Sequence, residues 1–120
     1  MNKFRQFGIS SSIAALSLIS LLYTNAGAYD RRVMIINHTS YDMVGFYASN
    51  VDASSWEENI LINNNISPLQ PGQRLNVNVD DGTGHCIFDF KAAFDNGSSA
   101  VRRRLDVCRT NSWTVIDRNE

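Results

Sequence analysis

The chain has 120 residues, with 11 lysines and arginines against 12 aspartates and glutamates, and a formal net charge of −1 at pH 7. Proteins that bind nucleic acids normally carry a strongly basic face, so this balance argues against that class. The chain has 2 cysteines, which by themselves cannot supply the four ligands of a structural zinc site.

Residues 1–28 have the three parts of a secretory signal peptide. Lys3 and Arg5 precede an apolar run from Ile9 to Leu22, and small residues follow at Ala26 and Ala28. The apolar run is shorter than the roughly 20 residues that span a bilayer, which favours a cleaved leader over an anchor helix. We therefore predict cleavage after Ala28 and a periplasmic or secreted protein with no membrane segment after cleavage.

Residues 29–120 are enough for one small domain, expected to be a monomer. Loss of Lys3 and Arg5 lowers the formal charge from −1 to −3. In an oxidising compartment, Cys86 and Cys108 are predicted to form a disulfide. The chain-entropy model gives a bridge of this span about 3 kcal/mol of stabilisation, a large share of the stability of so small a domain.

The first predicted strand is 31–37, where four consecutive apolar residues indicate burial on both faces. A turn at 38–42 leads into a second strand, 43–49, which Gly45 interrupts at a bulge or a close approach of the backbone. Neighbouring strands joined by a short turn usually pair. We expect these two strands to form a hairpin.

A long loop, 50–73, follows and is expected to cross from one sheet to another. Ser55 and Glu58 have the spacing of a capping box, which predicts one helical turn from Trp56 to Asn59. We interpret Trp56 as a cover over the core, with a ligand platform as the alternative. Pro71-Gly72 fits the central positions of a type II turn.

The third predicted strand, 75–79, alternates apolar and polar residues, so its leucine and valines face the core. The loop 80–84 comes next. Its carboxylates, Asp80 and Asp81, are candidate ligands for a calcium ion, but aspartate and glycine are also what a turn requires for backbone reasons. The loop lacks the ligand ladder of an EF-hand, which favours the turn.

The clearest periodic signal is the strand that begins at Cys86. Phe88, Phe90 and Phe94 lie on the predicted core side, together with Ala92. Asn96-Gly97 predicts a hairpin turn, and 100–108 returns antiparallel, so that the disulfide ties the start of one arm to the end of the other. A last strand, 112–116, precedes a charged tail.

Arg102, Arg103 and Arg104 form a basic run on the returning arm. Side chains alternate along a strand, so at most Arg102 and Arg104 would share a face. The opposite arm carries Asp89, Lys91 and Asp95, and cross-strand ion pairs between the arginines and its acidic residues are one interpretation. Binding of an anionic envelope polymer or of a partner's acidic face, through Arg102 and Arg104, is the other.

No catalytic residue is identified. His85 adjoins Cys86, but neighbouring side chains on a strand point to opposite faces and the thiol is expected to be oxidised. His38 falls in a turn, and no motif places a nucleophile near it.

The predicted fold is all-β, an antiparallel sandwich of six to seven strands, immunoglobulin-like or C2-like, with one short helical turn. Several of its segments together resemble small secreted bacterial proteins of unknown function: 46–50, Trp56, 60–61, 69–72, 81–84, 86–92, 94–97 and 106–108. The resemblance covers nearly all of 37–108 and implies paired cysteines in one β domain, with no reaction or cofactor.

The function expected is therefore non-enzymatic, a binding or structural module of the cell envelope that uses an exposed edge strand or the 50–73 loop. A calcium-stabilised domain is one alternative. A small lyase or hydrolase is another, since sequences of this kind sometimes carry a label such as argininosuccinate lyase. That enzyme class looks like a large helical oligomer, and a short β domain has neither its length nor its motifs.

Overall fold

The computed structural model describes residues 29–117, so the predicted leader, its cleavage site and the last three residues lie outside the described part. The described elements are β1 (Arg32–His38), β2 (Met43–Asn50), α2 (Ile60–Asn63), β3 (Arg74–Asn78), β4 (Ile87–Phe94), β5 (Ser99–Asp106) and β6 (Ser112–Ile116). Within that range, no helix has the length and apolar character needed to cross a membrane.

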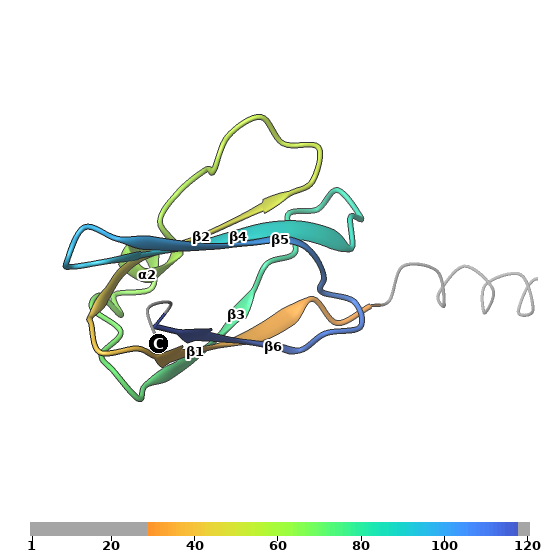
Figure 1. Ribbon diagram of the computed structural model, residues 1–120. Coiled ribbons are helices and arrows are strands. Elements are labelled where there is room, and N and C mark those ends of the chain that lie inside the picture. The colour runs from red at the N-terminus through yellow and green to blue at the C-terminus, as the bar shows by residue number, and fades with distance from the viewer. Residues whose placement is uncertain (1–28, 118–120) are drawn as a thin grey trace, which may run out of the picture.

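The strands form two three-stranded sheets that face each other (Figure 1). One sheet has the order β3-β1-β6 and the other has the order β2-β4-β5; they are called the β1 sheet and the β4 sheet after their central strands. All pairs are antiparallel except β1 with β6, which run parallel. The all-β, sandwich-like prediction is confirmed, with six described strands, but the prediction of a wholly antiparallel sandwich is wrong, because β6 enters the sheet beside β1 in the same direction.

Side-chain alternation produces the core. The predicted core side of β4 is confirmed, because Phe88, Phe90, Ala92 and Phe94 are at most 7% exposed and the residues that alternate with them are only half-buried. Phe90 packs edge-on against Phe46 of β2, with ring centroids 5.3 Å apart. Trp113 of β6 approaches Phe90 from the other sheet at 5.8 Å. This aromatic cluster holds the two sheets together.

The hairpin between β4 and β5 is confirmed, and only Gly97 at its turn needs a positive φ (+85°). The N–H of Gly97 bonds to the carbonyl of Phe94, and the N–H of Phe94 bonds to the carbonyl of Ser98. This is a turn closed by a left-handed glycine. The predicted disulfide between Cys86 and Cys108 is confirmed and ties together the two arms at the far end.

The expected hairpin between β1 and β2 is wrong, because the two strands belong to different sheets. The corner is built around Asn37, which is fully buried. Its side-chain amide donates to the carbonyls of Tyr41 (2.9 Å) and Leu69 (2.8 Å), and its oxygen accepts from the N–H and hydroxyl of Thr39. These bonds satisfy the backbone where the chain leaves one sheet for the other.

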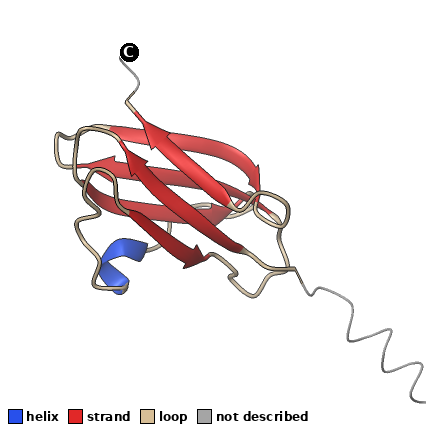
Figure 2. Cartoon of the chain, turned by 90° about the horizontal axis from the view of Figure 1, so that it is seen from below, coloured by secondary structure: helices blue, strands red, loops and turns tan. Residues whose placement is uncertain are grey.

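The predicted helical turn is displaced along the chain. The helix α2 begins after Asn59, whose side chain accepts from the N–H of Leu61, and it lies at one side of the sandwich (Figure 2). Glu57 has a φ of +65°, so the expected capping box of Ser55 and Glu58 does not start a helix. The loop from β2 to β3 does cross between the sheets, as predicted.

Replacement Cys86→Ser is expected to lower the free energy of unfolding by about 3 kcal/mol, because the unfolded chain loses its cross-link. Urea unfolding under oxidising conditions measures the change. The reduced parent protein is the control and should match the variant. A variant as stable as the oxidised parent would contradict this account of the hairpin's anchor.

Candidate functional site

Each three-stranded sheet ends in two edge strands, β3 and β6 in one sheet and β2 and β5 in the other. The outer peptide groups of an edge strand can pair with a strand from another chain, and natural proteins usually block them. How each of the edges is treated therefore indicates where this protein can bind a polypeptide.

The edge of β2 is covered by other parts of the chain. The side chain of Asn59 accepts from the N–H of Phe46 (3.1 Å) and donates to the carbonyl of Val44 (3.0 Å), as a neighbouring strand would. Further along, Met43 and Leu69 exchange two backbone hydrogen bonds of 2.9 Å. These contacts occupy the strand's outer groups over much of its length.

The edge of β5 carries a β-bulge. One residue of β4, Asp89, lies opposite two residues of β5, Arg103 and Arg104. Arg104 has a φ of +56°, and its N–H bonds to the Asp89 carboxylate at 2.9 Å. The Arg103 guanidinium pairs with the same carboxylate at 3.1 Å. A bulge and exposed charges both discourage strand pairing, so this edge is blocked.

The bulge also corrects the predicted placement of the arginines. Arg102 pairs with Phe90, and Leu105 pairs with Phe88. Both phenylalanines face the core, so Arg102 lies on the inner face of β5, while Arg104 joins Arg103 on the outer face. The two candidate binding residues, Arg102 and Arg104, are therefore on opposite faces, and the observed ion pair belongs to Arg103.

Trp56 lies outside the core, contrary to the favoured interpretation. The loop after β2 arches over the outer face of the β4 sheet (Figure 1). There Trp56 is half-buried, and the Arg103 guanidinium carbon lies 5.5 Å from its ring centroid. Together with Ser49 and Asp89 they line a hollow of about 120 Å³. Because Asp89 already neutralises Arg103, this hollow offers no uncompensated charge to a ligand.

The edge of β3 carries polar and charged residues that discourage strand pairing. Val79 bonds through its N–H to the carbonyl of Arg31, so the residues with outward peptide groups are Arg74, Asn76 and Asn78. Asparagine is depleted in strands, and a charge at an edge discourages pairing.

The edge of β6 has neither a charged residue nor a covering segment along its outward side in the described part of the chain. Met34 bonds through its N–H to the carbonyl of Asn111, and the register pairs Met34 with Ser112. With this register in a parallel ladder, the peptide groups of Trp113 and Val115 point toward β1. The outward residues are Ser112, Thr114 and Ile116, all exposed and uncharged, and the last two favour strands.

A cleft adjoins this edge. It has a volume of about 580 Å³ and lies between the end of β6, the start of β5 and the corner after β1. Its walls include Tyr41 and Ile116, which are 43% and 54% exposed, and the buried Phe94. The one carboxylate in its lining, Asp117, accepts hydrogen bonds from the N–H and hydroxyl of Ser40. The β6 edge and the adjoining cleft are together called the open side of the sandwich. This side combines free peptide groups with apolar surface.

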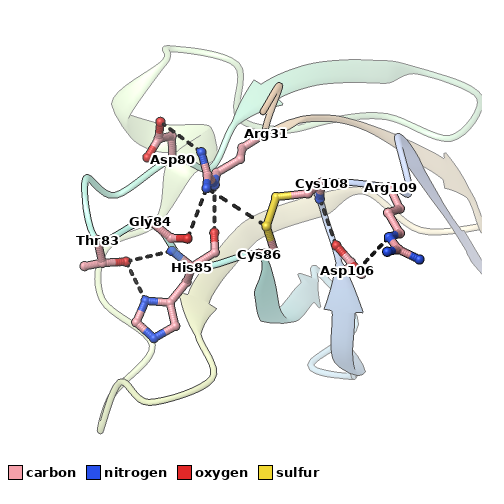
Figure 3. Close-up of a disulfide and its surroundings, with 9 residues drawn as sticks. All are labelled: Arg31, Asp80, Thr83, Gly84, His85, Cys86, Asp106, Cys108 and Arg109. Carbon is pink, nitrogen blue, oxygen red and sulfur yellow. Dashed lines mark hydrogen bonds and ion pairs between the residues drawn. A yellow bond between two sulfur atoms is a disulfide. The ribbon is translucent and has the colours of Figure 1, made fainter. Parts of the chain in front are cut away.

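The candidate calcium ligands are engaged within their own loop. Asp80 accepts from the N–H of Gly82 and lies 3.8 Å from the Arg31 guanidinium (Figure 3). Asp81 accepts from the Asn50 amide at 2.8 Å and from the N–H and hydroxyl of Thr83. Partial burial raises the pKa of Asp81, but these hydrogen bonds together outweigh it and leave the pKa below its usual value. The two carboxylates therefore serve as turn residues.

Arg31 fixes this loop to the disulfide. It is 6% exposed, and its guanidinium donates to the carbonyls of His85 (2.7 Å) and Gly84 (3.1 Å) (Figure 3). One terminal nitrogen also lies 4.0 Å from the sulfur of Cys86. The planar guanidinium presents five donors in a rigid fork, whereas a lysine has three donors on a single nitrogen at the end of a flexible stem. Sequence inspection assigned Arg31 only to a strand.

His85 is held between a carboxylate and a hydroxyl. Nε2 lies 2.8 Å from Asp52, and Nδ1 lies 2.6 Å from the Thr83 hydroxyl. A hydrolase would need that hydroxyl to give its proton to the histidine, but the Asp81 carboxylate also accepts from the Thr83 hydroxyl and competes for the same proton. No sequence pattern indicates this contact, because Asp52 is far from His85 along the chain. The exposed His38 is not among the residues that line the cleft.

A scan against protein-family models and searches of curated proteins and solved structures find no match to this chain.

Replacement Arg31→Met is expected to lower the free energy of unfolding by about 2 kcal/mol, because the part-buried hydrogen bonds from Arg31 to the carbonyls of His85 and Gly84 are lost. The neighbouring Arg32→Met is the matched control. Arg32 pairs only with Asp30, both more than half exposed, so its change should stay within about 0.5 kcal/mol. Equal effects in urea unfolding would show that Arg31 does not clamp the loop.

Proposed function

We propose that this protein is a non-enzymatic binding module of the periplasm or extracellular space, a component of the cell envelope. It binds another polypeptide by adding that chain's extended segment to the β1 sheet alongside β6. Main-chain hydrogen bonds to Ser112, Thr114 and Ile116 supply the attachment, as in other cases of strand addition.

The observation that carries this proposal is the contrast between β6 and the other edges. Asn59 and Leu69 cover β2, a bulge blocks β5, and an arginine with two asparagines lies along β3. The outward residues of β6 are uncharged and belong to a regular five-residue strand. An unprotected edge of this kind is the feature that strand addition requires.

The polar clusters support binding better than catalysis. The Thr83 hydroxyl donates to Asp81, and Cys86 is bonded to Cys108. The disulfide removes the Cys86 thiol as a nucleophile, and the Asp81 carboxylate competes with His85 for the Thr83 proton. Calcium binding at Asp80 and Asp81 and an immunoglobulin-like or C2-like classification stay predictions that no contact described above favours.

Replacement Thr114→Pro is expected to abolish partner capture, because proline removes the central outward N–H of β6. Asn76→Pro makes the same chemical change at the centre of the other edge of the sheet, and it should leave capture intact. The measurement compares proteins recovered from envelope extract on the immobilised parent and both variants, with circular dichroism to check folding.

Two results would overturn the proposed function. One is recovery of no specific protein by the parent at several salt concentrations. The other is equal recovery by the parent and by folded Thr114→Pro.

A further inference from the structure

We infer that the strand received by β6 carries an acidic side chain on its inward face, where it meets Arg102. This inference rests on the proposed function and adds the chemistry of the partner. It is carried by the position of Arg102 relative to Trp113 and by the distribution of charge along the open side of the sandwich.

Arg102 faces inward from an edge strand. Its register partner on β4 is Phe90, whose side chain is fully buried between the sheets. Cross-strand partners project to the same side of a sheet, so the Arg102 side chain leaves β5 toward the level of the β1 sheet. It nevertheless stays exposed, because β5 has no further strand beside it to enclose that side chain.

On a strand added to β6, the residue position nearest to Arg102 is the one beside Trp113. The ring of Phe90 contacts Trp113 across the core at 5.8 Å, and Arg102 is the next residue outward from Phe90 on the β4 sheet. A strand added to β6 is the next strand outward from Trp113 on the β1 sheet. The inward side chain of such a strand at the level of Trp113 would therefore be on the side of the sandwich to which Arg102 projects.

Charge complementarity then selects the partner. Among the described residues, Arg102 takes part in no ion pair, whereas Asp89 compensates Arg103 on the outer face. Asp117 gives the other end of the open side a negative charge. An acidic residue is thus favoured beside Trp113 and disfavoured beside Ile116, which positions the partner along the edge as well as attracting it.

The test uses three short capped peptides of alternating threonine and valine. They differ only at the middle valine, which is replaced by glutamate, glutamine or lysine, so that the test residue lies on the apolar face that packs inward. Binding is followed by the NMR shifts of the Ser112 and Ile116 amides, which Thr114→Pro retains. The glutamate peptide is expected to bind the parent protein about five-fold more tightly than the glutamine peptide, and the lysine peptide more weakly than either.

Arg102→Gln should remove this preference, and Arg102→Glu should reverse it in favour of the lysine peptide. Arg104→Gln is the matched control, because Arg104 lies on the outer face beyond the bulge, and it should leave the preference unchanged. Equal affinity for the three peptides, or equal effects of Arg102→Gln and Arg104→Gln, would overturn the inference while leaving strand addition intact.

Two other outcomes bear on the edge itself. Binding of no peptide at millimolar concentration, or full binding by Thr114→Pro, would contradict strand addition and with it the inference. Heparin serves as a polyanion probe. If the parent protein and Thr114→Pro bound heparin equally well through Arg102, while neither bound a peptide, Arg102 would be assigned to a polyanion site instead.

Discussion

The parallel pairing of β1 with β6 is the contact on which the rest of the arrangement depends. It brings the first and last described strands together and directs Trp113 and Val115 into the core. Because peptide groups alternate along a strand, the same pairing turns those of Ser112, Thr114 and Ile116 outward. The pairing that completes the core thus also creates the exposed edge.

Polar side chains complete the backbone wherever the chain leaves a sheet. Asn37 closes the corner after β1, Asn59 takes the place of a strand beside β2, and Arg31 holds the loop before the disulfide. The described part has no buried side-chain nitrogen or oxygen without a hydrogen-bond partner. These groups are engaged in the fold, whereas, among the described residues, the outer peptide groups of β6 have no strand beside them and Arg102 has no ion pair.

Local patterns in the sequence predicted much of the fold. The alternation around Phe90 identified the core side of β4, Asn96-Gly97 identified its hairpin, and the two cysteines identified the disulfide. The pairing of β1 failed, because the composition of a short turn does not encode whether its flanking strands share a sheet. That depends on Asn37, whose partner Leu69 is far along the chain.

The candidate site was predictable only in part. The sequence predicts strand addition at an exposed edge and offers Arg102 as a candidate, but strand order decides which edge is open. The bulge that separates Arg102 from Arg104 depends on Asp89, which bonds to Arg104 from the neighbouring strand. Such a contact leaves no periodic trace in the sequence, since an extra residue in a strand looks like an ordinary member of it.

Amide hydrogen exchange along β6 tests the central claim most directly. In the free protein, the amides of Ser112, Thr114 and Ile116 should exchange faster than those of Trp113 and Val115, which bond to β1. A bound strand should slow the first group and leave the second unchanged. Equal protection of both groups in the free protein, or no slowing of the first group on binding, would contradict the account.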